Sequence, residues 1–514
     1  MPISFETIPA NWKQPLYWVE VDGSKAGFPR SHMRGLLVGT MMTAQTNTAL
    51  NGVARPDVPI PIGRQAEADH QFGQGSELAN QFKAFFANNK AQEMWALPVA
   101  EPTAGTAATG TITVANAPTE AGTIQLYIAG TAVRVGVPAA AVVNDVAAAI
   151  ASSINDNPNL PVTAVAAAAI VTLTAKWFGV TGNDITMFDS YHGRVGGEEL
   201  PPGLTLTYSG FQLTGGAGTP DFTAAIANLG EDEYEFVSLP YTDSTTLQAW
   251  EAEYGFSDSG RWGWMRQLYG HLFSAKRGSY SDLITWGLTR NGKILSCMGI
   301  EATAPSPVYE WSAAYAGKAA RGLLNDPARP LQTLHLETIL PAKGHDRFNL
   351  LELNALASTG IATQRTLSDN VPMISRETTT YQLNLYGQGD DAFELVTTLA
   401  TLAKLIRNQR QVITSKYPRH KLADDGTRFG PGQAIVTPKI IKAELVAQYA
   451  IDAWNGLCEN MNAFKANLIV ERDVNDPNRL NVLYPPDLIN QLRVFAVLAQ
   501  FRLQYDRGID TAIL

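Results

Sequence analysis

The sequence is short of cysteine, of long apolar runs and of basic charge. Its 514 residues include two cysteines, Cys297 and Cys458, which lie far apart and outside any CxxC motif. A disulfide framework is therefore excluded, and synthesis in the cytoplasm is expected. No apolar run reaches the ~20 residues that a membrane crossing needs, and the opening MPISFETIPANW lacks the basic and apolar regions of a signal peptide. The net charge of −9 argues against general nucleic-acid binding.

Motifs that carry chemistry are missing as well. The sequence contains no GxxxxGKS/T phosphate loop, no GxSxG nucleophile elbow and no HExxH zinc motif. Its 7 histidines are dispersed, at His32, His70, His192, His271, His335, His345 and His420. We therefore expect no catalytic site, no metal site and no cofactor.

Two acidic stretches each allow both a chemical and a purely structural interpretation. EDEYE (231–235) has the carboxylates for acid–base or metal chemistry, but a solvated turn is favoured because charged side chains are usually exposed. DDGTRFGPG (424–432) lacks the ligand spacing of an EF-hand, so a turn-rich loop is expected there.

The length predicts about three domains, and composition changes along the chain place their borders. Between residues 103 and 218 charged residues thin out, and Ala, Thr, Gly and Val form short strands with Gly or Asn between them. VNDVAAAIASSIND (143–156) is the one expected helix, with Asn144 or Asp145 as its cap. TAGTAATG and TGGAGTP bracket this region as paired hinges, which indicates a β-rich module inserted into another domain.

On both sides of that module the pattern alternates between strands and helices. Strands are expected at 35–42, 93–99, 234–240, 271–275 and 293–300. Helices are expected from Ser76, over 244–255, over 279–288 and over 309–324. Such alternation is typical of an α/β domain.

From about Gln388 the character shifts again. DDAFELVTTLATLAKLIRNQR predicts an amphipathic helix with Phe393, Leu395, Leu399, Leu402 and Ile406 on one face. A second helix is expected to open with Pro438. The end of the first helix and the loop after it carry a local excess of basic side chains. A solvated helix end is favoured and a phosphate contact is the alternative for these residues, Arg407, Arg410, Lys416, Arg419 and Lys421.

Both termini carry strand-like segments. LYWVEV (16–21) stands alone before a Gly-containing stretch, and residues 500–506 alternate between polar and apolar side chains after an apolar run. Period-two alternation predicts half-buried strands. The pattern leaves two interpretations open, an edge strand of the chain's own sheet or a strand donated to another molecule.

Several long segments resemble the Mu-like contractile phage tail sheath proteins. They are RWGWMRQLYGHLF (261–273), DPARPLQTL (326–334), PRHKLADDGTRFGPGQAIVTP (418–438) and DPNRLNVLYPPDLINQLRVFAVLAQFRLQY (476–505). The resemblance runs essentially end to end, and it is weakest over 101–218.

The resemblance implies an α/β, overall α+β, fold. It comprises an N-terminal arm (1–30), a subtilisin-like α/β domain (31–100 and 219–387), an outward-facing β-rich insert (101–218) and a C-terminal α+β domain (388–514). The arms would be donated to neighbouring subunits through Leu16, Tyr17, Trp18, Val19, Val21, Phe495, Val497, Phe501, Leu503 and Tyr505. The basic cluster at 407–421 would face the tail tube.

The implied function is structural and not enzymatic. The subunit would form stacked hexameric rings around a tail tube and contract, with itself, the tube, the baseplate and the tail terminator as partners. It would insert into no membrane, and its final location would be the virion. Two rival functions are another tail or baseplate component, and a hydrolase on a subtilisin-like fold. The first is disfavoured because tube proteins are far shorter, the second because no triad can be assembled.

Overall fold

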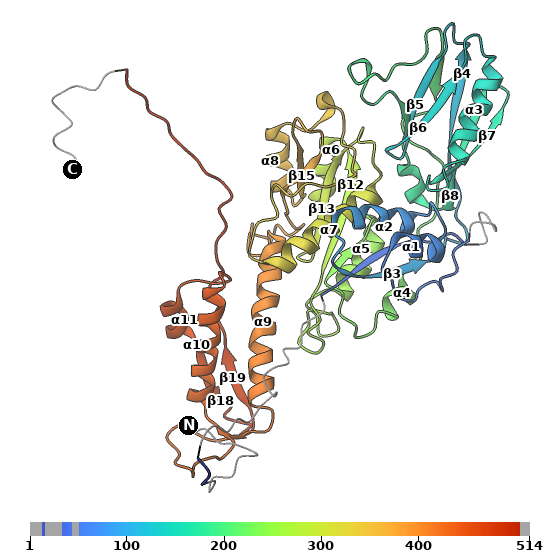
Figure 1. Cartoon of the computed structure of the whole chain (residues 1–514). Helices are drawn as coiled ribbons and strands as arrows, with labels where there is room; N and C mark the ends of the chain where they lie inside the picture. The colour runs from blue at the N-terminus through green and yellow to red at the C-terminus, as the bar shows by residue number, and fades with distance from the viewer. Residues whose placement is uncertain (1–12, 16–32, 44–50, 504–514) are drawn as a thin grey trace.

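The computed structural model describes residues 13–15, 33–43 and 51–503. Figure 1 shows a β-rich lobe, a central α/β lobe and a smaller helical lobe, followed by a C-terminal tail that runs away from the body. None of the helices in these described residues is long and apolar enough to cross a membrane.

The central lobe is built on a six-stranded sheet. Its order is β13 (Leu295–Glu301), β12 (His271–Gly278), β11 (Phe236–Ser238), β1 (Arg34–Thr40), β3 (Glu93–Val99) and β2 (Ile60–Pro61). All neighbours are parallel except β2 and β3. The middle residues of the longer strands are mostly apolar because helices cover both faces, as parallel sheets require.

Alternate side chains of each strand serve two cores. Leu37 belongs to the core under α2 (Glu77–Asn88) and α7 (Val308–Asn325). Leu36 and Val38 belong to the opposite core, with α5 (Ser244–Glu253) and α4 (Thr223–Ala227). α1 (Gln65–Phe72) packs on α2.

The helix starts show where local sequence decided the structure. Ser76 caps α2, as expected, and Ser279 forms a capping box with Asp282 at α6 (Tyr280–Gly287). The expected cap of α3 (Val143–Asn155) is wrong, because Val142 is the N-cap residue and makes no side-chain cap bond. Asp145 lies instead in the first turn, where the helix dipole favours negative charge.

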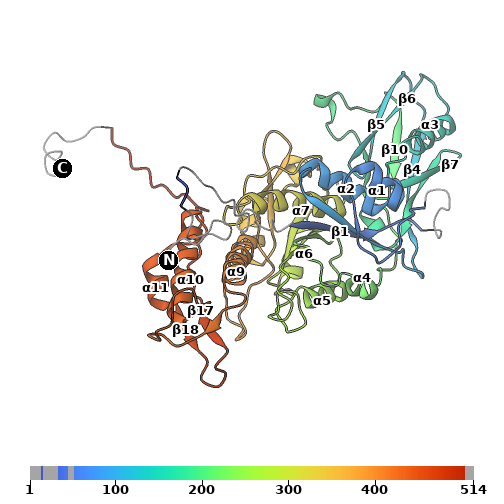
Figure 2. The same cartoon turned by 60° about the horizontal axis from the view of Figure 1, so that its bottom comes forward.

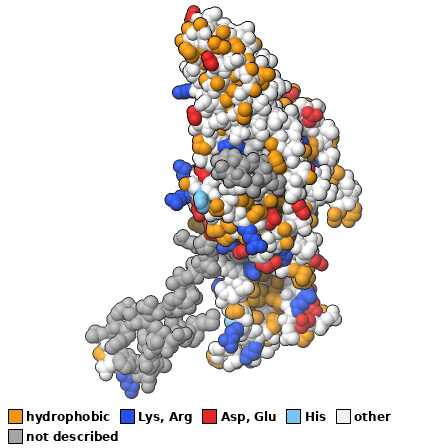
Figure 3. All heavy atoms as spheres, turned by 90° about the vertical axis from the view of Figure 1, so that its right-hand side faces the viewer, with side chains coloured by type: hydrophobic (Ala, Val, Ile, Leu, Met, Phe, Trp, Pro, Cys, Tyr) orange, Lys and Arg blue, Asp and Glu red, His pale blue; other side chains and the backbone are white. Residues whose placement is uncertain are grey.

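The β-rich region carries its own core. A four-stranded sheet has the order β10 (Thr205–Tyr208), β4 (Ala107–Asn116), β8 (Ile170–Phe178), β7 (Val162–Ala167). A three-stranded sheet has the order β6 (Thr131–Val137), β5 (Gly122–Ile128), β9 (Met187–Asp189). The chain enters and leaves this region side by side, since Thr106 pairs with Ala217. Figure 3 shows few charged side chains on its outer face, at the top of that view.

A smaller unit flanks the sheet edge at β13. It consists of α8 (Leu350–Ser358), capped by Asn349, and the hairpin of β14 (Thr363–Thr366) and β15 (Pro372–Arg376). α9 (Val396–Lys416) then leads to the helical lobe.

α9 begins later than the sequence predicted. Phe393 and Leu395 precede it, because Glu394 pairs with Arg376 over 2.7 Å and Leu395 bridges to Thr378. These contacts hold the segment extended beside β15, and the helix follows.

The helical lobe contains α10 (Pro438–Trp454) and α11 (Met461–Asn467). Two small sheets accompany them, β16 (Lys421–Leu422) with β17 (Ile435–Val436), and β18 (Ile469–Arg472) with β19 (Leu480–Leu483). Pro438 opens α10 as predicted, and Thr437 caps it. Tyr449 and Phe464 stack in its core.

Candidate assembly surfaces

The C-terminal tail exposes a run of large apolar side chains. Residues 494–503 lie in no helix or strand and extend away from the body in both views (Figures 1 and 2). Their apolar side chains are largely exposed, among them Phe495 at 82%, Phe501 at 85% and Leu503 at 97%. The described part of the predicted strand is therefore not an edge strand of the chain's own sheets.

Other predicted arm residues lie outside the description. Tyr505 and the whole segment Leu16–Val21 fall outside residues 13–15, 33–43 and 51–503. The donation of either arm stays a prediction.

The predicted basic cluster does not stay together. Arg407 is turned toward the central lobe, where its guanidinium pairs with Glu233 over 2.6 Å and with Glu235, and lies over the ring of Tyr269. The other members are exposed at the far end of α9 and in the following loop, at Arg410, Lys416, Arg419 and Lys421. Lys416 pairs there with Glu444 of α10.

The EDEYE stretch is an ion-pair centre. Glu235 is 6% exposed, and burial raises its pKa to about 7 against the attraction of Arg407. Asp232 pairs with Arg34 over 3.1 Å, and Glu231 with Arg266 over 3.2 Å. The favoured interpretation as a solvated turn is wrong for Glu235 and Glu233, which join the central lobe to α9.

A second polar centre joins the β-rich region to the central sheet. Asp184 pairs with Arg277 over 2.5 Å and accepts from the backbone N–H of Val308. The Thr181 hydroxyl donates to Glu77, 2.9 Å away, and burial raises the pKa of this carboxyl to about 7. Open α/β sheets usually bind ligands at the carboxyl ends of their strands; here Arg277 lies near such an end, and the turn around Asp184 packs against it.

The sequence alone did not predict these two groups of ion pairs. Glu77 and Arg277 stand in ordinary helix and strand contexts, and their partners lie far away in sequence. The one available signal was the strong bias of buried α/β positions against charge, which marks Arg277 in β12 as a residue in need of a partner.

The groups that could act as nucleophile or base are poorly suited to it. His271 is buried, and desolvation lowers its pKa to about 3. Burial raises the pKa of the Cys297 thiol to about 12 and that of Cys458 to about 11. Within the part of the chain that the structure describes, no group of three His, Cys, Asp or Glu side chains is placed to hold a metal ion.

Comparison with known proteins defines the class. The model of the phage tail sheath protein central domain matches residues 215–380, and that of the phage tail sheath C-terminal domain matches residues 388–502. A "Mu-like prophage FluMu tail sheath protein" of Haemophilus influenzae is 37% identical over 505 residues, which are 98% of this chain and 100% of that protein. The chain therefore belongs to the family of Mu-like phage tail sheath proteins.

Solved structures are related more distantly. A sheath tail protein of Desulfitobacterium hafniense matches at 12% identity and a TM-score of 0.44, over 92% of this chain and 100% of that one. A sheath tail protein of Listeria innocua matches at 10% and 0.46, over 89% and 92%. A chain of the anti-feeding prophage baseplate matches at 10% and 0.46, over 96% and 99%.

Proposed function

We propose that the chain is a virion subunit that polymerises as stacked hexameric rings around a tail tube and contracts to drive the tube through a host envelope. Its partners are other copies of itself, the tube, the baseplate and the tail terminator, and it is synthesised and assembled in the host cytoplasm. The observation that carries the proposal is the C-terminal tail, whose apolar side chains find no cover in the described fold. Family membership supports a structural role.

The tail's composition favours strand addition. Phe495, Val497, Phe501 and Leu503 have exposed fractions of 82%, 69%, 85% and 97%. Burying such side chains against a partner stabilises the complex by ~25 cal/mol for each Å² of apolar surface removed from water. Each backbone hydrogen bond adds ~1 kcal/mol net, so an added strand of a few bonds gives a stable link.

The helical lobe offers a receiving sheet. β18 and β19 form a two-stranded sheet, which leaves an outer edge on each strand. Ile469 and Leu483 lie on it with exposed fractions of 49% and 59%. A third strand from another copy would cover them, and isolated hairpins gain stability from added strands. The N-terminal segment Leu16–Val21 is proposed to add a further strand.

The tube contact is proposed for the far end of α9. Arg410, Lys416, Arg419 and Lys421 are exposed in a protein with a net charge of −9, so they would favour an acidic partner. Arg407 is left out of this surface, because Glu233 and Glu235 occupy its guanidinium.

We propose the domain division 1–30, 31–100 with 219–387, 101–218 and 388–514. The mostly parallel sheet between two helical layers supports a subtilisin-like central domain, and the separate core of 101–218 supports an insert that faces outward. Contraction would then repack rigid domains while the arms keep the subunits linked.

The test is assembly of the purified chain. Negative-stain images should show striated hollow tubes for the full chain and for no variant that lacks residues 494–514. Uniform small particles from the full chain at high concentration, with and without tube, would count against the proposal.

A further inference from the structure

The tail is held firmly at one point before it leaves the body. Residues 484–489 pack on the helical lobe, where Cys458 bridges to Leu488 and the Ile489 N–H donates to Leu457 over 3.2 Å. A few residues later, Gln491 and Arg493 contact the central lobe. The chain therefore crosses from one lobe to the other just before residues 494–503 become exposed.

The contact with the central lobe is a buried ion pair. Arg493 Nη1 donates to Glu377 Oε2 over 3.0 Å, and Nη2 donates to the other carboxylate oxygen. The Glu377 side chain is 0% exposed and that of Arg493 is 11% exposed. A two-pronged pair of this kind fixes orientation as well as position.

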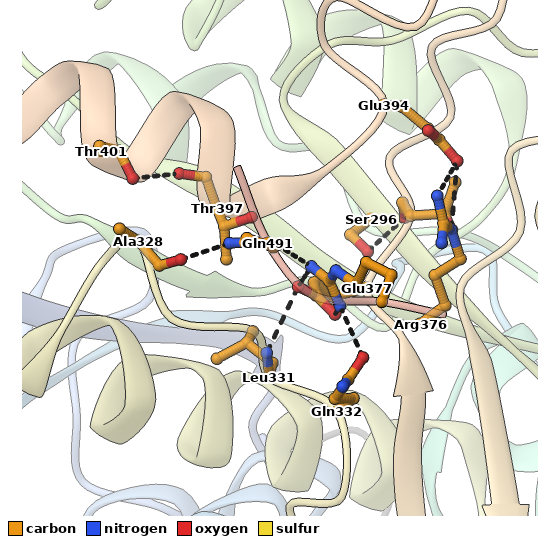
Figure 4. A network of polar contacts seen from close by, with 12 residues as sticks. Ser296, Ala328, Leu331, Gln332, Arg376, Glu377, Glu394, Thr397, Thr401 and Gln491 are labelled. Atoms are coloured by element: carbon orange, nitrogen blue, oxygen red, sulfur yellow. Dashed lines mark hydrogen bonds and ion pairs between the residues drawn. The ribbon is translucent and has the colours of Figure 1, made fainter. Parts of the chain in front are cut away.

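Further hydrogen bonds hold the segment that crosses between the lobes. The Gln491 amide donates to the carbonyl of Ala328, and the Gln332 amide lies 3.5 Å from the carbonyl of Leu492. The Leu331 N–H donates to Glu377 over 3.4 Å. Figure 4 shows Glu377 among Leu331, Gln332 and Gln491, beside the first turn of α9.

Glu377 also contacts the other connection between the lobes. The N–H of Val396, the first residue of α9, donates to the Glu377 carbonyl over 3.2 Å. The backbone of Glu377 thus holds the start of α9, while its side chain holds Arg493. The covalent connection through α9 and the non-covalent contact through Arg493 therefore meet at this one residue.

We infer that Arg493 and Glu377 form a latch that fixes the helical lobe against the central lobe and sets where the C-terminal arm departs. With the latch closed, the helical lobe is tied to the central lobe through α9, which Arg407 also holds, and through the segment 489–493; with it open, only α9 and Arg407 restrain the lobe. A pull on the arm then acts on the central lobe at Glu377 and not on the small sheet of β18 and β19. Arg493 is thus a positioning residue for the arm, and this last step rests on the proposed function.

The test measures the distance between the lobes in the full chain. Nitroxide labels at Thr285→Cys on α6 and Lys465→Cys on α11 use two exposed sites, while Cys297 and Cys458 are buried. Pulsed electron–electron double resonance then measures the distance between the two nitroxides in the unassembled fraction from gel filtration. We expect one narrow distance distribution for the otherwise unmodified chain.

The variant must remove the latch without leaving a buried charge alone. Arg493→Met with Glu377→Gln neutralises both partners at similar volume, whereas Arg493→Met by itself leaves an unpaired carboxylate that destabilises the fold. We expect the double variant to keep its circular dichroism spectrum and to broaden the distance distribution at least twofold. Arg376→Met with Glu394→Gln is the control, because it removes a neighbouring ion pair and leaves Arg493 and Glu377 in place. Its distribution should stay narrow, since the Val396 N–H still bonds to the Glu377 carbonyl at the start of α9.

The two claims fail separately. An unchanged, narrow distribution in the folded double variant would overturn the latch, whatever its assembly. Failure of the unmodified chain to form tubes would overturn the proposed function and leave the distance result standing. If both hold, the double variant should form fewer or shorter tubes than the control variant at equal concentration.

Discussion

The β-rich region 103–217 and the tail 494–503 use the same apolar residue types in opposite ways. In the first, Ile112, Leu173 and Trp177 are fully buried in a core made almost entirely within the region. In the second, Phe495 and Phe501 are more than four-fifths exposed. A segment with apolar alternation and no cover of its own points to a partner surface elsewhere.

Removing the tail should separate folding from assembly. A chain that ends at Arg493 keeps every described element and the latch, so its free energy of unfolding should change by less than about 0.5 kcal/mol. Tube formation should be lost completely. Urea unfolding and negative-stain microscopy measure the two properties; Leu503→Pro, which removes one backbone N–H, should act in the same direction. Unfolding of the shortened chain would show that the tail belongs to the subunit's own core.

Truncating a side chain in the core of the β-rich region should, in contrast, lower the stability of the subunit. Leu173→Ala opens a cavity at a fully buried site and should cost about 2–5 kcal/mol of stability. Phe495→Ala, at 82% exposure, should leave the stability of the unassembled subunit nearly unchanged. Thermal unfolding of both variants measures the two changes in stability. Equal losses of stability would contradict the contrast between a buried core and an uncovered tail.

The junction between insert and sheet should be costly to break. Asp184→Ala leaves the Arg277 guanidinium buried without its carboxylate, and such losses are about 3–5 kcal/mol. We expect that residues 103–217 can be deleted with assembly intact if Arg277 is replaced as well, for instance by Met. The deletion with Arg277→Met should fold and form tubes, whereas the deletion alone should be markedly less stable. Loss of all polymerisation in both would contradict an outward-facing, dispensable insert.

The buried carboxyl of Glu77 predicts an unusual pH dependence. Its folded-state pKa is raised from 4.5 to about 7, so the folded state binds the proton more tightly than the unfolded state. Stability is then greatest near and below pH 4.5 for this group, and is lost as the pH rises toward 7. Glu77→Gln should make that slope smaller, by at most about 1.4 kcal/mol for each unit of its pKa shift, and the rest of the slope belongs to other buried carboxyls such as Glu235. Urea unfolding at pH 5 and pH 8 checks it; equal slopes in both proteins would contradict the assignment.

The smallest effect is expected at the proposed tube surface. Arg410→Glu with Lys416→Glu should change the stability of the subunit by about 0.5 kcal/mol or less. Tube-templated assembly should weaken most at low salt, because at 0.1 M exposed charges separated by more than ~10 Å are already screened from each other. Sedimentation with purified tube at two salt concentrations measures it. Arg407→Glu is a contrasting variant, since it should destabilise the subunit itself through Glu233 and Glu235.

Local pattern and long-range contact explain what the sequence could and could not predict. The strands of the central sheet and the starts of α2, α6 and α10 follow from apolar runs and capping residues, which act within a few residues. The start of α9 and the place of Arg407 do not, because Arg376 and the pair Glu233–Glu235 decide them from other elements. The apolar alternation of the tail is visible in the sequence, and its donation as a strand stays a prediction. The latch at Glu377 could not be predicted, since Arg493 is locally one polar residue beside an apolar run.

Cross-linking across copies tests strand donation most directly. A photo-reactive phenylalanine at position 501 is placed in a ¹⁵N-labelled chain, mixed with unlabelled chain, assembled and irradiated. Mass spectrometry should then find labelled peptides around residue 501 joined to unlabelled peptides that contain 469–472 or 480–483. Cross-links confined to labelled peptides of the same chain, in tubes that contain both chains, would contradict a donated strand.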